Sequence, residues 1–113
     1  MKWIKSRVQF EEAMVGKLAL VGFCAPWCSS CRLQEPILDR LSTRFAGSVF
    51  IGALNIDEHK ELAKALDIRC IPTLLIFRDG IEIHRFVGLH PEASLAEAVA
   101  ECAGQGRFST VLA

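Results

Sequence analysis

The segment LALVGFCAPWCSSCRLQEPILDRL, residues 18–41, contains the pattern that decides the fold. Residues 18–23 form an almost continuous apolar run, which is typical of a β-strand buried on both faces. Over residues 29–45 the apolar side chains instead recur every three or four positions, which predicts an α-helix that Pro36 should kink. Two cysteines, Cys28 and Cys31, therefore fall where a buried strand gives way to the first turn of a helix.

The same two patterns alternate along the rest of the chain. Asp57 is a predicted helix N-cap, and Asp79-Gly80 is a strong signal for a hairpin between two antiparallel strands. Pro91 opens a last helix, which Gly104 should close. The predicted elements outside the first segment are a helix over 6–15, a strand over 48–56, a helix over 58–66, strands over 73–77 and 81–87, and a helix over 91–104.

Strands that alternate with helices, followed by a hairpin and a final helix, predict the α/β class. We expect a central mixed β-sheet flanked by helices on both faces. A length of 113 residues is typical of one domain. The sequence therefore predicts a single domain over residues 1–113, with about 104–113 as a loose C-terminal tail.

Composition and charge exclude several classes of function. Hydrophobic residues make up 51% of the chain and charged residues 23%, which excludes a disordered protein. Thirteen Lys and Arg balance thirteen Asp and Glu, so no basic excess predicts a nucleic-acid partner. The longest uncharged run, residues 18–31, is shorter than the ~20 apolar residues of a membrane helix. The first residues also lack the apolar stretch of a signal peptide, so we expect a cytoplasmic protein with no membrane partner.

The five cysteines indicate the chemistry: Cys24, Cys28, Cys31, Cys70 and Cys102. An odd number at irregular spacings is a poor disulfide framework, and close cysteines in a cytoplasmic protein indicate redox chemistry or metal binding. Cys28 lies at the predicted start of a helix, where unpaired backbone N–H groups and the helix dipole stabilise a thiolate. Cys31 lies one turn later on the same face, within reach of a disulfide. The pair predicts a thiol–disulfide oxidoreductase with Cys28 as nucleophile and Cys31 as resolving thiol.

Metal binding is the alternative that this cysteine pattern leaves open. Cys24, Cys28 and Cys31 have the spacing Cys-x3-Cys-x2-Cys, and Cys70 is a candidate fourth ligand for zinc or an iron–sulfur cluster. Against this alternative, Cys24 should end its strand pointing away from the loop that holds the other two. We expect no metal and no other cofactor.

Further motifs resemble the thioredoxin family. Residues 20–32 are similar to its active-site segment, and the resemblance extends over about residues 8–103 and implies the thioredoxin fold. It implies a cis peptide bond before Pro72, beside the cysteine pair, and an extended substrate segment paired with the backbone at Ile71. It also implies substrate-binding roles for Trp27 and Gly88. The motifs that match in order and spacing are Pro36-Ile37-Leu38, Leu54-Asn55-Ile56-Asp57, Ile71-Pro72-Thr73-Leu74-Leu75-Ile76-Phe77, Asp79-Gly80 and Val87-Gly88.

The same resemblance implies the partners. They are disulfide-containing protein substrates and an electron donor of the thioredoxin-reductase type. Cys70 lies two residues before Pro72, at a position expected to face the partner. We expect a monomer that an accessory Cys70 thiol links into a dimer under oxidation.

The chain departs from the family at the positions that tune its chemistry. Gly22 and Ala53 stand where the family usually has a buried Asp–Lys pair, so help in deprotonating Cys31 must come from elsewhere or be missing. Ser29-Ser30 stands where Gly-Pro is familiar, which predicts a weaker reductant. Cys24 stands in the place of a Trp and is expected to be a small buried hydrophobe.

Overall fold

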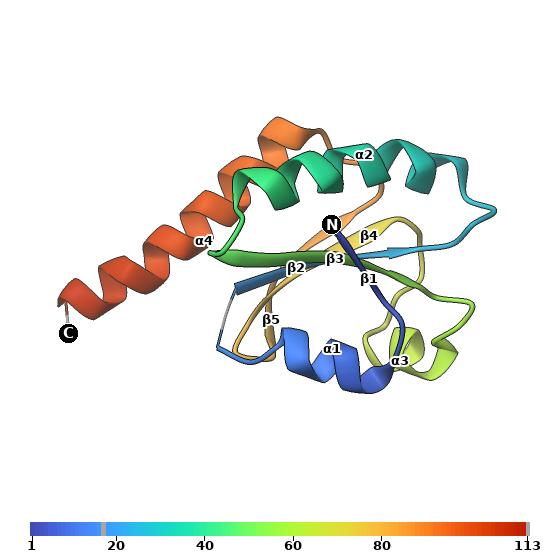
Figure 1. The fold of residues 1–113 in the computed structure, drawn as a ribbon, viewed down its shortest axis with the longest axis horizontal. Helices are drawn as coiled ribbons and strands as arrows, with labels where there is room; N and C mark the ends of the chain where they lie inside the picture. Colours follow the sequence, from blue (N-terminus) through green and yellow to red (C-terminus); the bar gives the residue numbers. More distant parts are fainter. Residues whose placement is uncertain (17, 113) are drawn as a thin grey trace.

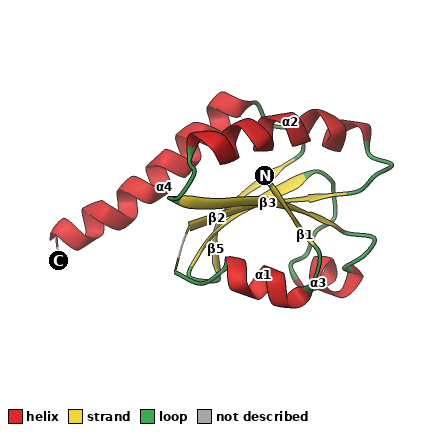
Figure 2. Cartoon of the chain, viewed as in Figure 1, coloured by secondary structure: helices red, strands yellow, loops and turns green. Residues whose placement is uncertain are grey.

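The computed structural model describes residues 1–16 and 18–112 as a five-stranded sheet with helices on both faces (Figure 1). The elements in chain order are β1 (Lys2–Ile4), α1 (Arg7–Ala13), β2 (Leu18–Cys24), α2 (Ser29–Arg44), β3 (Val49–Asn55), α3 (Lys60–Ala65), β4 (Thr73–Arg78), β5 (Ile81–Val87) and α4 (Glu92–Leu112). The strand order is β1-β3-β2-β4-β5. The first three strands in this order run parallel and the last two pairings are antiparallel, so the sheet is mixed, as predicted (Figure 2).

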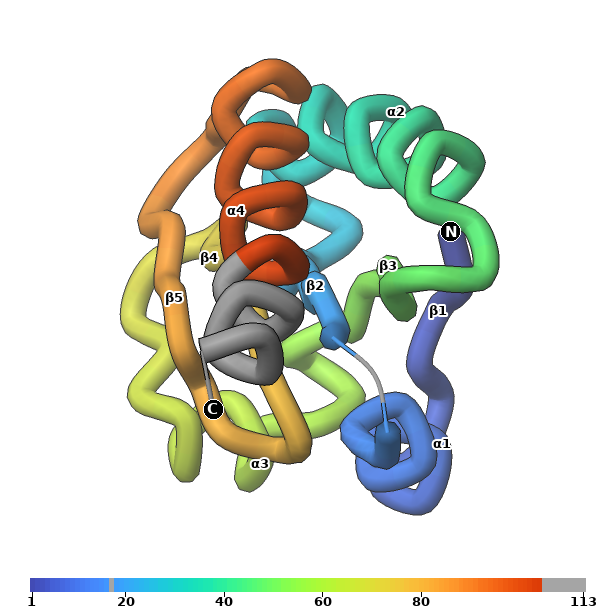
Figure 3. Tube along the Cα trace, turned by 90° about the vertical axis from the view of Figure 1, so that its left-hand side faces the viewer, coloured from blue at the N-terminus to red at the C-terminus, as the bar shows by residue number. Residues whose placement is uncertain are grey.

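Strand β2 occupies the centre of the sheet. It pairs with β3 on one side and with β4 on the other, and it is buried from Ala19 to Cys24. Alternate side chains of a strand face opposite sides of the sheet. Figure 3 shows α1 and α3 on one side of the sheet and α2 and α4 on the other. Val21 and Phe23 accordingly pack in the core on the side of α1 and α3, whereas Leu20 packs on the side of α2 and α4. The prediction of a strand buried on both faces is confirmed.

Helix α2 buries a row of side chains at Cys31, Gln34, Leu38 and Leu41. These positions recur every three or four residues, so they lie on one face of the helix. Leu33, which the apolar pattern placed on the inner face, is instead 63% exposed. Its neighbour Gln34 takes the buried position, and Pro36 is accommodated inside the helix on its exposed side.

Strand β1 and the start of helix α3 differ from the prediction. Strand β1 was not predicted, since three residues are too few to show a periodicity; it pairs in parallel with β3. Helix α3 begins at Lys60, because the side chain of Asn55 accepts the backbone N–H of Asp57 at 2.9 Å and holds a turn before the helix. The N-cap of α3 is therefore His59, and the prediction of Asp57 as N-cap is wrong.

Helix α4 continues to Leu112, beyond Gly104, where the sequence predicts its end. A glycine inside a helix costs about 1 kcal/mol relative to alanine and does not by itself stop the helix. No proline follows Gly104, and alanines precede it. Within residues 1–16 and 18–112, no helix is long and apolar enough to cross a membrane.

Candidate active site

The cysteine pair lies between the end of β2 and the start of α2. Cys28 is the N-cap of α2, and its Sγ accepts the backbone N–H of Cys31 at 3.2 Å. The sulfur thus satisfies one of the N–H groups that a helix start leaves unpaired. Cys28 is 7% exposed and Cys31 fully buried. Arg32 holds the preceding loop by donating from Nη2 to the carbonyl of Pro26 at 2.9 Å.

A second segment, remote in sequence, lies against Cys28. The peptide bond between Ile71 and Pro72 is cis, as the family resemblance implies. The Cys28 thiol donates to the Ile71 carbonyl at an Sγ–O distance of 3.8 Å. The antiparallel pairing of β2 with β4, in which Phe23 lies opposite Thr73, brings the two segments together.

Gly88 completes this side of the site. Its backbone N–H donates to the Pro72 carbonyl at 2.7 Å, so this bond ties the residue after β5 to the proline. Gly88 has a φ of +90°, a conformation that glycine adopts without strain, and a Cβ added there would meet no atom within 4 Å. The surface at Gly88 is therefore open, with exposed Val87 and Leu89 on either side.

Trp27 lies on the solvent side of the cysteine pair and is 66% exposed. Its indole N–H donates to Oδ2 of Asp57 at 2.9 Å. This bond gives Asp57 a role that the sequence did not reveal: it orients the exposed indole instead of capping α3. An exposed, oriented tryptophan beside a reactive pair is a surface on which a partner can pack.

Cys24 belongs to the same buried cluster as Ala25, Cys28 and Cys31. It is 1% exposed, as expected of a small buried hydrophobe. The expectation that it points away from the loop is wrong. It shares a face of β2 with Gly22, because residues two apart in a strand lie on the same side, and that face is covered by α2.

The surroundings of the buried thiols favour their protonated forms. Burial raises the pKa of Cys31 to about 11, and the hydrogen bond to Cys28 adds to this shift. Hydrogen bonds from the backbone of Ala25 and from the Cys24 thiol act in the opposite direction. Burial also raises the pKa of Cys24, and its contact with Cys31 raises it further. Cys31 must therefore lose a proton before it can attack, and Cys24 is poised to stabilise the resulting thiolate.

No acid stands behind Cys31 at the position that the family uses. Gly22 and Ala53 are register partners on β2 and β3, and both are buried. A Cβ on Gly22 would lie 2.9 Å from Cδ1 of Leu38 and 3.2 Å from Cδ2 of Leu74. The side chains of Leu38 and Leu74 therefore fill the space that an acidic side chain at position 22 would occupy.

The structure does not support the four-cysteine metal site. Cys24, Cys28 and Cys31 are buried together, but Cys70 is exposed and lies outside their cluster. Cys102 is half-buried and packs against a different cluster. Among the described residues, no group of three or more His, Cys, Asp or Glu side chains is arranged to hold a metal ion.

Gln34 is a residue of the site region that the sequence analysis missed. Its amide bonds to the backbone of His90, in the loop that follows Gly88. The available signal was its position: a polar residue three after Cys31 and four before Leu38 lies on the inner face of the helix.

Comparison with known proteins gives consistent matches along the chain. A family model described as Thioredoxin matches residues 2–101. A thioredoxin of Chlamydia pneumoniae is 38% identical over 96 residues, which cover 85% of this chain and 93% of that protein. A thioredoxin of a Synechocystis species is 41% identical over 80 residues, which cover 71% of this chain and 75% of that protein. The crystal structure of Malassezia sympodialis thioredoxin superposes with a TM-score of 0.83 at 28% identity, covering 91% of this chain and 90% of that one.

Proposed function

This chain belongs to the thioredoxin family, and from that premise we propose that Cys28 is its nucleophile and Cys31 its resolving thiol. The family consists of protein-disulfide oxidoreductases, so thiol–disulfide exchange is the reaction of this chain. One observation carries the assignment of roles. The Sγ of Cys28 sits at the N-terminus of α2 against the Ile71 carbonyl, whereas Cys31 is fully buried beneath it.

The proposed reaction has two exchange steps. The Cys28 thiolate attacks one sulfur of a substrate disulfide, forming a mixed disulfide and releasing the other substrate sulfur as a thiolate. Cys31 then loses its proton and attacks the Sγ of Cys28. This second step forms the Cys28–Cys31 disulfide and releases the second substrate thiolate. The substrate gains two electrons, and an electron donor of the reductase type must return two electrons to the cysteine pair.

Substrate binding is assigned to the surface around Cys28. We propose that the backbone at Ile71, next to Pro72, pairs with an extended substrate segment, a mode in which main-chain hydrogen bonds supply the affinity. The exposed Trp27 indole supplies an apolar contact on one side, and the open surface at Gly88 admits the substrate backbone on the other. Disulfide-containing proteins are therefore the proposed substrates.

Cys70 is proposed as an accessory thiol. It is exposed and directly precedes Ile71, so it lies at the edge of the proposed substrate surface. We propose a monomeric protein, acting as a single domain in the cytoplasm, that oxidation links through Cys70 into a dimer. The cysteine pattern, an odd number with a close redox pair, supports a reducing compartment.

Trapping of the mixed disulfide tests the assignment of roles. A Cys31→Ser protein incubated with a disulfide-containing peptide should accumulate one adduct on Cys28, which mass spectrometry locates. A Cys28→Ser protein should neither form this adduct nor reduce the peptide. Cys102→Ser, on α4, is the matched control and should behave as the unmodified protein. An adduct on Cys70 instead of Cys28 in the first variant, or an adduct on Cys31 in the second, would refute the roles proposed.

The reduction potential of the Cys28–Cys31 pair tests the proposed direction of use. Ser29 and Ser30 are the first two residues of α2 and directly follow Cys28. Stabilising the thiolate of Cys28 makes the disulfide more oxidising. We expect the Ser29→Gly, Ser30→Pro double variant to have a lower potential than the unmodified protein. Equal potentials in a redox titration with glutathione would contradict this expectation.

A further inference from the structure

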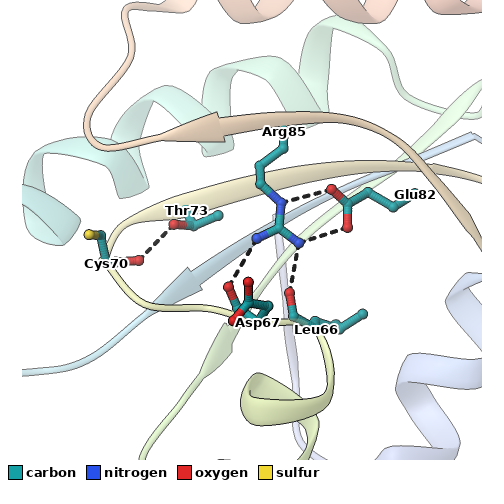
Figure 4. A network of polar contacts seen from close by, with 6 residues as sticks. All are labelled: Leu66, Asp67, Cys70, Thr73, Glu82 and Arg85. Atoms are coloured by element: carbon teal, nitrogen blue, oxygen red, sulfur yellow. Dashed lines mark hydrogen bonds and ion pairs between the residues drawn. The ribbon is translucent and has the colours of Figure 1, made fainter.

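Arg85, on the edge strand β5, reaches across to the end of α3 (Figure 4). Its Nη2 donates to the carbonyl of Leu66 at 2.7 Å, and its Nη1 donates to the carbonyl of Asp67 at 3.1 Å. Leu66 is the C-cap of α3, and carbonyls at the end of a helix have no partner within it. A cation at this end is also favoured by the helix dipole. Arg85 therefore caps α3 from a neighbouring strand.

Glu82 holds the guanidinium of Arg85 in place. Its two carboxylate oxygens accept from Nε at 2.7 Å and from Nη2 at 2.8 Å, so the pair is bidentate. Residues three apart on a regular strand face opposite sides. Here the pairing of β5 with β4 shifts register. Ile76 of β4 lies opposite His84, but the next residue, Phe77, lies opposite Glu82.

The shift leaves Ile83 as an extra residue, a β-bulge. As a result Glu82 and Arg85 pair with Phe77 and Leu75, two residues that lie in the same core cluster. The bulge thus puts the carboxylate and the guanidinium on one face of β5.

The capped turn leads directly into segment 67–72, which contains the proposed substrate-binding backbone at Ile71. Asp67 has a φ of +56° and reverses the chain, and Ile68 donates back to the carbonyl of Ala63 at 2.9 Å. At the other end, the Thr73 hydroxyl donates to the Cys70 carbonyl at 2.6 Å (Figure 4). Gly88 donates to the carbonyl of Pro72. Strand β5 and the glycine that follows it therefore hold both ends of this segment: Arg85 holds its start and Gly88 its end.

We propose that Arg85, oriented by Glu82, is a positioning residue that holds segment 67–72 at the distance from Cys28 that protein substrates require. This inference rests on the proposed function, in which the backbone at Ile71 pairs with substrate. Ile68 and Ile71 pack against buried clusters, but the side chains of Arg69 and Cys70 between them are exposed, so core packing does not hold the middle of the segment. Loss of the clamp should weaken binding of an extended substrate. Attack by Cys28 on a small disulfide, which needs no backbone pairing, should be unaffected.

The test compares two substrates across a set of variants. The variants are Arg85→Met, Arg85→Lys and Glu82→Gln, with Arg7→Met, an exposed arginine on α1, as the matched control. One substrate is a peptide with a disulfide in an extended segment, and the other is the small aromatic disulfide dithiobis(nitrobenzoate). Arg85→Met should raise KM for the peptide at least fivefold and leave kcat and the small-disulfide rate within twofold. Lysine lacks the planar fork, so Arg85→Lys should recover only part of the peptide KM.

A second measurement keeps the inference testable without catalysis. Amide hydrogen exchange at Cys70 and Ile71 should be faster in Glu82→Gln than in the unmodified protein, because the guanidinium loses its bidentate partner. Unchanged exchange together with an unchanged peptide KM in folded variants would overturn the inference, as would an equal loss of both substrate rates. Because the exposed Cys70 thiol can also react with the small disulfide, the proposed function is checked in a Cys70→Ser background, and reduction of the small disulfide by a Cys28→Ser, Cys70→Ser protein would overturn it.

Discussion

Gln34 on α2 bonds to the backbone of His90 through both ends of its amide. Its Nε2 donates to the His90 carbonyl at 3.0 Å, and its Oε1 accepts the His90 N–H at 2.9 Å. Gln34 is fully buried, so these bonds satisfy an amide that has no access to water. They tie the helix that begins at the cysteine pair to the loop that follows Gly88.

Removing this amide should destabilise the protein. In Gln34→Met, both backbone groups of His90 lose their partner, and we expect the free energy of unfolding to fall by about 1–3 kcal/mol. Urea unfolding measures the change. Leu33→Met, at the exposed neighbouring position, is the control and should stay within about 0.5 kcal/mol. A Gln34→Met protein as stable as the control would show that the two bonds contribute no net stability.

The resolving step should depend steeply on pH. Burial raises the pKa of Cys31 to about 11, so the thiol is protonated at pH 7 and its thiolate fraction rises tenfold per pH unit. In the mixed disulfide the sulfur of Cys28 carries no charge, so its contribution to the raised pKa of Cys31 is smaller, but burial, the largest cause of the shift, remains. Breakdown of a thionitrobenzoate adduct on Cys28, followed by stopped flow, should therefore accelerate from about pH 7 to 9. A flat, fast profile between about pH 6 and 8 would mean that another group serves as the base or that Cys31 is already activated.

Cys24 should assist this step. Its thiol donates a hydrogen bond that lowers the pKa of Cys31, so Cys24→Ala should slow adduct breakdown by about two- to tenfold, the worth of one hydrogen bond. Cys24→Ser, which keeps a donor, should restore most of the rate. Cys102→Ala is the control on α4. If Cys24→Ala folds and resolves as fast as the control, Cys24 is only a packing residue.

Restoring an acid at Gly22 should require more than one substitution. Gly22→Ala places a Cβ 2.9 Å from a Leu38 methyl and should cost about 1–3 kcal/mol of stability. Gly22→Asp adds a buried carboxylate with no cation and should cost several kcal/mol more. Adding Ala53→Lys, on the register partner, should recover part of this loss. Urea unfolding of the three variants measures these differences in stability. Equal stability of Gly22→Ala and Gly22→Asp would mean that the carboxylate reaches water.

The long, strongly patterned elements were predictable from sequence. The apolar run of β2, the helical spacing of α2 and the turn at Asp79-Gly80 each depend on residues close together in the chain. The cysteine pair was predictable for the same reason, since its chemistry depends on a three-residue spacing at a helix start.

Features that depend on contacts between remote residues were not predictable. Asp57 before an acidic residue is a valid N-cap signal, but the Asn55 side chain holds its N–H and Trp27 binds its carboxylate. The bulge at Ile83 is hidden because the alternation through Ile81 and Ile83 reads as regular. The orientation of Cys24 toward Cys31 depends on which face of β2 the helix α2 covers, and periodicity does not decide that.

The central pairing of β2 with β4 also makes catalysis a reporter of folding. Cys28 follows β2 and Ile71 precedes β4, with α2, β3 and α3 between them. Closing so long a loop costs chain entropy before the new contacts repay it. A partly folded chain that has α2 and the β4–β5 hairpin therefore has its thiols but no backbone surface beside them to hold a substrate. Regain of peptide-disulfide reduction during refolding should mark the moment at which the centre of the sheet closes.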